Sequence, residues 1–256
     1  TKANMNKRDF SVVIPNYNDV RIYRTLESIA NQKHKNIEVI IVDGNSTNKD
    51  VDIVYDKYKS IIDILIKEPD KGIFDALNKG IKASSGKYIL LMGADDKLSD
   101  AGIFSDVFNL IQSNENLTGV CIECHFTNSH GKVVRKWVPS KITKNRIKWG
   151  LLPPHFSLFL NKDVYSKLGL FDISEGNIGL DSKWLLKLWK IDNLNSPILK
   201  GHSVLMELGG TSTGSIRNIL IAYKKIALEA RKLKYKNWFI LPLIKILSKT
   251  PQFLIK

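Results

Sequence analysis

The sequence predicts an α/β protein with a central, mostly parallel sheet flanked by helices. Over the first hundred of its 256 residues, short apolar segments alternate with segments whose apolar residues recur at helical spacing. The short segments are apolar along their whole length, as expected of strands covered on both faces. Each of them runs into polar residues, and parallel strands bring such ends together at one edge of the sheet.

The N-terminal half is predicted to contain four strands and three helices. The segment DFSVVIP is an apolar strand stopped by a proline, and IEVIIVDG is rich in β-branched residues. Ile22, Leu26 and Ile29 share one face of the first helix. The expected strands are 9–15, 37–44, 62–70 and 87–96, and the expected helices are 20–33, 48–60 and 72–84.

The C-terminal half is less regular. We expect a hairpin over 117–139 that turns at 129–131, and a strand with a short helix over 153–172. Further predictions are a helix over 176–190, an extended segment over 196–210 and a long helix over 215–234. The predicted organisation is one domain over 1–214, followed by a basic amphipathic helical region over 215–256.

The net charge of +14 is unevenly distributed. From Arg217 to Lys256 there are ten Lys or Arg residues and one Glu. A basic segment with aromatic residues suits an anionic membrane surface, and a solvated helix face explains it equally well. Nucleic acid is disfavoured because the segment 237–256 is too apolar to follow phosphates and no binding motif accompanies it.

Signals for export or membrane spanning are not evident in this sequence. The stretch WFILPLIKIL is short and contains Pro242 and Lys245, and the first fifteen residues lack an apolar secretory segment. Met5 is a candidate for the natural first residue. We therefore expect a cytoplasmic protein, with peripheral attachment to the inner face of the cytoplasmic membrane as an open alternative.

The two cysteines, Cys121 and Cys124, form the pattern C-x-x-C-H with His125. This pattern is used for covalent haem attachment, which requires export, and a zinc site needs further ligands at matching spacing. Neither condition is met in the sequence. We attribute the pattern to chance within a strand.

Polar clusters follow all four predicted strands of the first half. Asp95 and Asp96 are adjacent carboxylates at the mouth of an apolar strand, where each loses solvation and repels the other. A turn is one explanation, and a divalent cation that neutralises both is the other. The clusters are Pro15-Asn16-Tyr17-Asn18, Asp43-Gly44-Asn45-Ser46, Glu68-Pro69-Asp70-Lys71 and Asp95-Asp96.

The order of these segments resembles glycosyltransferase family 2, of the GT-A fold. The resemblance covers about residues 9–190 and is carried by SVVIPNYND, IEVIIVDGNST, EPDKGIFDALNKGIKASSGKYILLMGADD and GLFD…GLDSKWLLKL. It is greatest to bacterial enzymes of O-antigen, capsule and related envelope polysaccharides. It implies a nucleotide-diphospho-sugar donor, most often a UDP-sugar, and Mn²⁺ or Mg²⁺ as cofactor. It also implies transfer of a hexosyl or N-acetylhexosaminyl group to a saccharide or lipid-linked acceptor.

The resemblance also implies roles for individual residues. Asp43 is expected to contact the uracil or ribose. Ala94-Asp95-Asp96 corresponds to the D-x-D element, with Ala94 in place of its first aspartate, so that Asp96 is the expected metal ligand and Asp95 a ribose or sugar contact. Asp181 corresponds to the catalytic base, in GLDS where the family commonly has an E-D pair. Pro15, Asn16 and Tyr17 are expected beside the nucleotide, and Gly209, Gly210, Thr211 and Ser212 in a loop near the diphosphate or acceptor.

The residue types support this chemistry independently. A divalent ion on hard oxygen ligands stabilises a departing diphosphate, and a carboxylate on the opposite face of the sugar takes the acceptor proton, which inverts the anomeric centre. Asp181 is the candidate base, with helix capping as its alternative role.

Other polar residues and three tryptophans have weaker assignments. Asp70 and Lys71 are assigned to donor binding, and a surface turn is their alternative. Trp149, Trp184 and Trp189 are expected in the core more than as sugar platforms. Asp75, Asn78 and Lys79 share one helix face, directed either into the crevice or to solvent, and His155 is assigned to the acceptor side or to a loop.

Three other classes remain in competition with an inverting glycosyltransferase. A sugar nucleotidyltransferase needs a glycine-rich basic loop after the first strand, which PNYNDVRIYR does not supply. A dinucleotide-dependent oxidoreductase needs G-x-G-x-x-G after the first strand, and the sequence has no such motif there. A non-catalytic nucleotide- or saccharide-binding module requires only the donor crevice, and the set Asp43, Asp96 and Asp181 argues against it.

Overall fold

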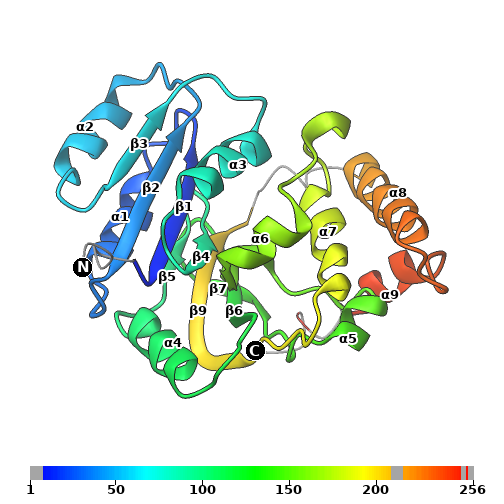
Figure 1. Cartoon of the computed structure of the whole chain (residues 1–256). Coiled ribbons are helices and arrows are strands. Elements are labelled where there is room, and N and C mark those ends of the chain that lie inside the picture. The colour runs from blue at the N-terminus through cyan, green and yellow to red at the C-terminus, as the bar shows by residue number, and fades with distance from the viewer. Residues whose placement is uncertain (1–7, 209–215, 249–251, 253–256) are drawn as a thin grey trace.

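The computed structural model describes residues 8–208, 216–248 and 252. A single mixed sheet forms its centre, in the order β3-β2-β1-β4-β8-β6-β9-β5, with β7 paired to β6 (Figure 1). Within these residues, no helix is long and apolar enough to cross a membrane. The strands are β1 Phe10–Asn16, β2 Ile37–Asp43, β3 Ile64–Lys67, β4 Tyr88–Leu91, β5 Lys97–Leu98, β6 Gly119–Thr127, β7 Val133–Trp137, β8 Leu158–Asn161 and β9 Ile198–Glu207.

The predicted parallel sheet is confirmed in the N-terminal half. β1 lies between β2 and β4 and is parallel to both, and β2 is parallel to β3. Beyond β4 the sheet is mixed, because β8 is antiparallel to β4 and β6, whereas β9 is parallel to β6. The polar ends of the first four strands therefore share one edge.

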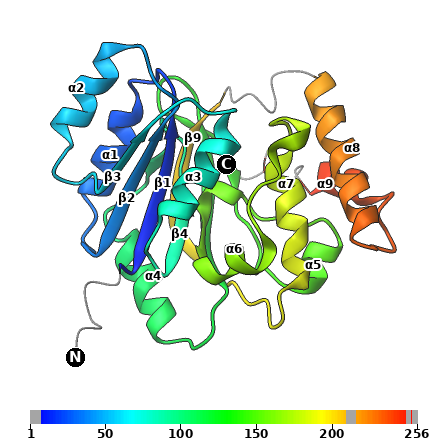
Figure 2. The ribbon, with the colours of Figure 1, turned by 45° about the horizontal axis from the view of Figure 1, so that its top comes forward.

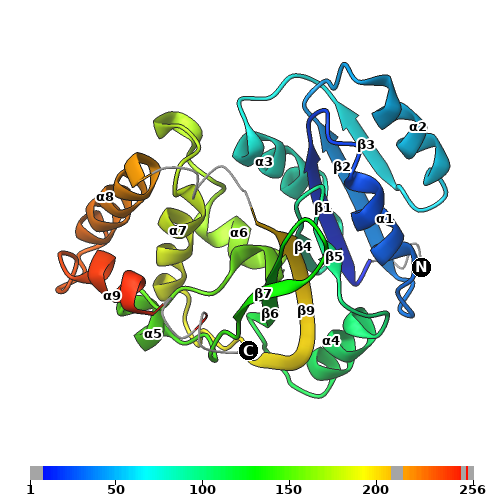
Figure 3. The same ribbon diagram turned by 180° about the vertical axis from the view of Figure 1, so that it is seen from behind.

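Helices cover both faces of the sheet, and Figures 1 and 3 show α1 and α3 on opposite sides of β1 and β2. Val12 and Ile14 face a cluster with α1, α2 and α4, whereas Val13 faces a cluster with α3, α6 and α7. The helices are α1 Ile22–Ala30, α2 Lys49–Lys57, α3 Ile73–Ala83, α4 Ile103–Gln112, α5 Lys144–Lys148, α6 Lys162–Leu168, α7 Leu180–Leu185, α8 Ile216–Lys232 and α9 Leu241–Leu247, with 3-10 turns η1 His155–Ser157, η2 Ile173–Glu175 and η3 Leu186–Lys190.

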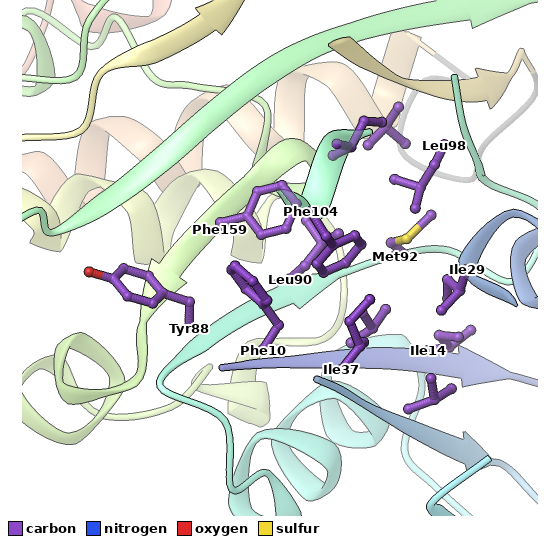
Figure 4. Packing of buried hydrophobic residues seen from close by; sticks show 14 of the residues in the cluster. Phe10, Ile14, Ile29, Ile37, Tyr88, Leu90, Met92, Leu98, Phe104 and Phe159 are labelled. Atoms are coloured by element: carbon purple, nitrogen blue, oxygen red, sulfur yellow. The ribbon is translucent and has the colours of Figure 1, made fainter. Parts of the chain in front are cut away.

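Aromatic rings join the parallel and mixed halves of the sheet (Figure 4). The Phe10 ring of β1 meets Phe104 of α4 and Phe159 of β8 edge-on, with ring centroids 5.1 Å and 5.7 Å apart. All three side chains are fully buried. Edge-to-face packing of this kind joins β1 to β8 across β4 through side chains.

The C-terminal helices pack on the η3 and α7 side of the molecule (Figure 2). Ile226, Ala230, Leu233 and Leu241 form a third apolar cluster around Leu186. Ala222 of α8 lies directly against Gly179, just before α7, because a Cβ at that glycine would be 3.0 Å from it. The division at residue 214 stays a prediction.

Several expected elements differ in extent. The predicted hairpin is present, but residues 176–190 form two short helices, α7 and η3, after a loop, where one helix was predicted. Helix α4 was not predicted. Trp184 is buried as predicted, whereas the core placement of Trp149 is wrong, because 52% of this residue is exposed.

Candidate functional site

The ends of β1, β2 and β3 are held together by backbone pairing. Asn16 is the register partner of Asp43, and Asp43 is in turn the partner of Lys67. The Gly44 N–H donates to the Asn16 carbonyl, and the Glu68 N–H donates to the Asp43 carbonyl. Three of the predicted polar clusters therefore meet at one place, as parallel pairing requires.

Asp43 forms the floor of this crevice. Its side chain is fully buried and accepts hydrogen bonds from the Ser46 N–H at 2.5 Å and the Tyr55 hydroxyl at 2.6 Å. The Asn16 amide donates to the same hydroxyl at 2.8 Å. Burial, together with the hydrogen bond to Asp43, raises the pKa of Tyr55. Asp43 thus anchors the loop after β2, and its contact with a nucleotide stays a prediction.

Tyr17, Gly44 and Asp70 lie against one another at this edge of the sheet. Tyr17 is 64% exposed, so its ring is available to a ligand. A Cβ at Gly44 would lie 2.5 Å from Oδ2 of Asp70 and 3.3 Å from the Tyr17 ring. Gly44 was not among the predicted site residues, although a glycine directly after a buried strand-end aspartate is a usable signal.

Three predicted donor-binding residues on α3 are engaged with the chain itself. Lys79 pairs with Glu68 at 2.9 Å and with Asp75 at 3.7 Å. The Asn78 amide donates to the Phe171 carbonyl and its oxygen accepts from the Phe171 N–H, both at 2.9 Å. These residues shape the wall between α3 and the segment before α7, and their direct contact with a donor stays a prediction.

The loop that contains Lys71 reaches towards α7. The Asn177 amide donates to the Lys71 carbonyl at 3.2 Å, and a Cβ at Gly72 would overlap the same amide. Gly72 has a φ of 106°, a conformation that favours glycine. The donor side of the crevice is thus in contact with the segment that leads to Asp181.

The two aspartates after β4 differ sharply in their surroundings. Asp96 is 1% exposed, and its Oδ2 accepts the Gly93 N–H at 2.7 Å. Burial raises the pKa of Asp96 to about 7, and the neighbouring charge of Asp95 adds to the shift. The Asp95 side chain keeps 27% of its surface exposed and lies 3.2 Å from Arg21. Burial also raises the pKa of Asp95, against the opposing effect of Arg21.

Arg21 belongs to a charged cluster that the sequence did not reveal. It contacts Asp19 at 2.6 Å and Glu207 at 3.8 Å, and Arg24 contacts the same Glu207 at 3.1 Å. Glu207 ends β9, more than a hundred residues after Asp95 in the chain, so no local pattern joins them. A cavity of about 460 Å³ begins beside this cluster and extends to the β6–β7 turn.

A divalent ion fits this site only if a ligand supplies most of its coordination. No group of three or more His, Cys, Asp or Glu side chains suited to a metal is found among the described residues. Asp95 is partly exposed and paired with Arg21, whereas Asp96 is buried and hydrogen-bonded to the chain. Oxygens of a diphosphate and water complete the preferred shell of Mg²⁺ or Mn²⁺.

Asp181 and His155 lie near each other, on α7 and η1. Asp181 is partly exposed in the first turn of α7. His155 is 4% exposed, stacks on Trp184 at 5.7 Å, and neither of its ring nitrogens has a partner in the described chain. Burial lowers the pKa of His155 to about 4, although the Asp181 charge acts in the opposite direction. His155 is therefore a neutral imidazole with free hydrogen-bonding capacity near Asp181. The predicted loop Gly209–Ser212 lies outside the described residues.

Sequence comparison identifies the family. The glycosyl transferase family 2 profile matches residues 11–169, which is more than half of the chain. A PGL/p-HBAD biosynthesis glycosyltransferase of Mycobacterium tuberculosis is 34% identical over 109 residues, 41% of this chain and 43% of that protein. The minor teichoic acid biosynthesis protein GgaB of Bacillus subtilis is 32% identical over 189 residues, 68% of this chain and 20% of that protein. The chain thus spans less than half the length of these relatives.

Solved structures share the fold. TarS 1–349 of S. aureus superimposes with a TM-score of 0.65 at 20% identity, over 96% of this chain and 74% of that one. A mannosyltransferase from Pyrobaculum calidifontis, in complex with GDP-Man and Mn²⁺, gives 0.62 at 13% identity, over 94% of this chain and 69% of that one. The chain belongs to glycosyl transferase family 2 and has the GT-A fold that its sequence predicts.

The raised pKa of Asp96 has a measurable consequence. The folded state retains a proton that the unfolded state releases above about pH 4, so Asp96 makes the protein less stable as the pH rises towards 7. Asp96→Asn removes the buried charge, and we expect roughly 2 kcal/mol of added stability at pH 8 and little change at pH 5. Urea unfolding of both proteins at the two pH values measures this. Equal destabilisation at both pH values would contradict the assignment.

Proposed function

We propose that this chain is an inverting glycosyltransferase that moves a sugar from a nucleotide-diphospho-sugar to a hydroxyl group. One observation carries the proposal: the polar ends of β1, β2 and β3 meet at one edge of the sheet, and the loop after β3 is hydrogen-bonded to the segment that leads to Asp181. UDP is the favoured nucleotide, supported by the fold shared with TarS, whose structure has been solved with UDP-GlcNAc. A hexosyl or N-acetylhexosaminyl group is the expected sugar.

We assign the carboxylate that would hold Mn²⁺ or Mg²⁺ to Asp95, in preference to the Asp96 expected from the sequence. Asp95 is partly exposed, whereas Asp96 is buried and hydrogen-bonded to the Gly93 N–H. When bound, the ion would neutralise charge on the departing diphosphate. Asp96 then fixes the conformation of the turn that presents Asp95.

Asp181 is the proposed general base. Its carboxylate is partly exposed at the start of α7, where it can take a proton from an acceptor hydroxyl. His155 is buried next to this region and remains neutral, so it neither competes for the proton nor repels a cation. Its ring nitrogens are buried without a partner, so a role on the acceptor side would require a side-chain movement that exposes them.

Bacterial surface polysaccharide synthesis is the proposed setting. The relatives named above are described as acting in teichoic acid and PGL/p-HBAD biosynthesis, which supports a saccharide or lipid-linked acceptor. A cytoplasmic enzyme at the inner face of the membrane fits such acceptors. A non-catalytic binding module is the second candidate, and it would need the donor crevice but not Asp181.

Replacement of Asp181 tests the catalytic proposal. We expect Asp181→Asn to lower UDP release from UDP-sugars, in the presence of saccharide acceptors, by at least about 100-fold, because the base is lost. UDP affinity should change less than about twofold, since the residue does not contact the nucleotide.

Asp163→Asn is the matched control, because Asp163 is also an aspartate in the first turn of a short helix, α6. It should leave turnover near the wild-type rate. Equal turnover by the wild-type protein and Asp181→Asn would remove the base assignment, and a wild-type protein that binds UDP but transfers no sugar would favour the binding module.

The choice between the two aspartates is also testable. Calorimetry should show that Mn²⁺ strengthens UDP binding to the wild-type protein, and that Asp95→Asn reduces this gain by at least about tenfold because a direct ligand is lost. Asp96→Asn should keep most of the gain. If Asp96→Asn loses the gain and Asp95→Asn keeps it, Asp96 is the metal ligand. If neither substitution reduces the gain, no metal binds at this turn.

A further inference from the structure

A second cavity lies far from the donor crevice, between the end of α5, η3 and the segment after α8. Its volume is about 360 Å³. Two hydrogen bonds fix its walls: the Tyr235 hydroxyl donates to the Leu186 carbonyl at 2.7 Å, and the Asn237 amide donates to the Lys148 carbonyl at 3.1 Å. Trp189 and Tyr235 meet edge-on at 5.7 Å. The cavity is therefore a formed feature of the fold with an aromatic interior.

Only basic residues supply formal charge around this cavity. Lys148, Lys234 and Lys236 line it, all three are exposed, and no Asp or Glu is among the lining residues. The Lys148 ammonium lies 5.6 Å from the centre of the Trp189 ring. An anion with an apolar part matches this combination of ammonium groups and aromatic surface.

Exposed apolar side chains continue from the cavity to the surrounding surface. Trp149, which lines the cavity, is 52% exposed, and Phe239 is 63% exposed. Leu243, Ile246 and Leu247 of α9 are about half exposed and lie on one helix face, at i, i+3 and i+4 spacing. Gly150 touches Leu241 at the start of α9, so these residues belong to one end of the molecule. Figure 3 shows that end, with α5, α8 and α9, opposite α2.

We propose that this end of the molecule docks on a bilayer containing anionic phospholipids. A lipid phosphate sits at the cavity rim between Lys148, Lys234 and Lys236, and Trp149, Phe239 and the exposed face of α9 enter the head-group region. Tryptophan is favoured at that depth, and lysines near the surface bind anionic lipids. A second copy of the chain is a poorer partner, because it would bring the same positive charge.

This surface is coupled to the catalytic side of the crevice. Helix α8 contacts Gly179, two residues before Asp181, and Lys245 of α9 donates to the Ser182 hydroxyl. Docking would therefore hold the start of α7 close to the bilayer. Docking depends on the charge and exposure of this surface, and it does not require the donor and base assignments proposed above.

Vesicle flotation of the full chain tests the proposal, with phosphatidylcholine vesicles that contain or lack phosphatidylglycerol. The wild-type protein should float only with the anionic vesicles. Lys148→Glu/Lys236→Glu should weaken that binding by at least about tenfold. Lys59→Glu/Lys82→Glu is the control, because it makes the same change in charge at exposed lysines elsewhere on the surface.

Trp149→Ala should also weaken binding to the anionic vesicles, without loss of UDP affinity or thermal stability.

Each alternative gives a different result. Equal binding by the two double variants would mean that net charge alone attracts the protein, and it would overturn the site. Binding of inorganic phosphate that Lys148→Glu/Lys236→Glu abolishes, without any flotation, would replace the lipid with a soluble anion. Concentration-dependent dimerisation lost in Trp149→Ala, again without flotation, would assign the surface to a second copy. Absence of UDP binding with normal flotation would count against the proposed function alone.

Discussion

The parallel alignment of β1 with its two neighbours is the constraint on which the candidate site depends. Because β2 and β4 run in the direction of β1, the residues after all three strands must occupy one edge of the sheet. Asn16 and Asp43 are partners at that edge, and Tyr55 of α2 bridges their side chains. Burial of this hydrogen-bonded group makes the floor rigid, so that the exposed residues above it are presented in a fixed arrangement.

Around the crevice, the buried aspartates and the more accessible aspartates have different roles. Asp43 and Asp96 are buried and bound to the chain, whereas Asp70 and Asp95 next to them are more accessible. The buried carboxylates hold loops, and the more accessible ones are the proposed ligand contacts. The charge on Asp95 is balanced in the unliganded protein by Arg21, which Asp19 holds in place. A cation or a diphosphate that enters the crevice must therefore compete with this network.

Local patterns were sufficient to predict the parallel strands and their polar ends, because both depend on hydrophobicity and turn residues close together in the chain. They failed where contacts are distant: Glu207 joins Arg21 and Arg24 only through the β6–β9 pairing, and Asn78 meets Phe171 across 93 residues. The sequence also could not predict which of Asp95 and Asp96 is buried, because this depends on how the turn after β4 folds back on Gly93. Trp149 was misplaced because an exposed tryptophan gives the same composition signal as one in a core.

The central claim is that a nucleoside diphosphate binds at the sheet edge beside Tyr17, Gly44 and Asp70. Calorimetric titration of UDP with Mn²⁺ into the wild-type protein and Gly44→Ala tests it, because the added methyl would lie 2.5 Å from Asp70 and displace that side chain without removing a charge. Gly102→Ala is the control, at a position with φ of −91° remote from the crevice. The account predicts a Kd at least about tenfold higher for Gly44→Ala alone, with thermal stability close to that of the wild type. Unchanged UDP affinity in a folded Gly44→Ala protein would contradict it.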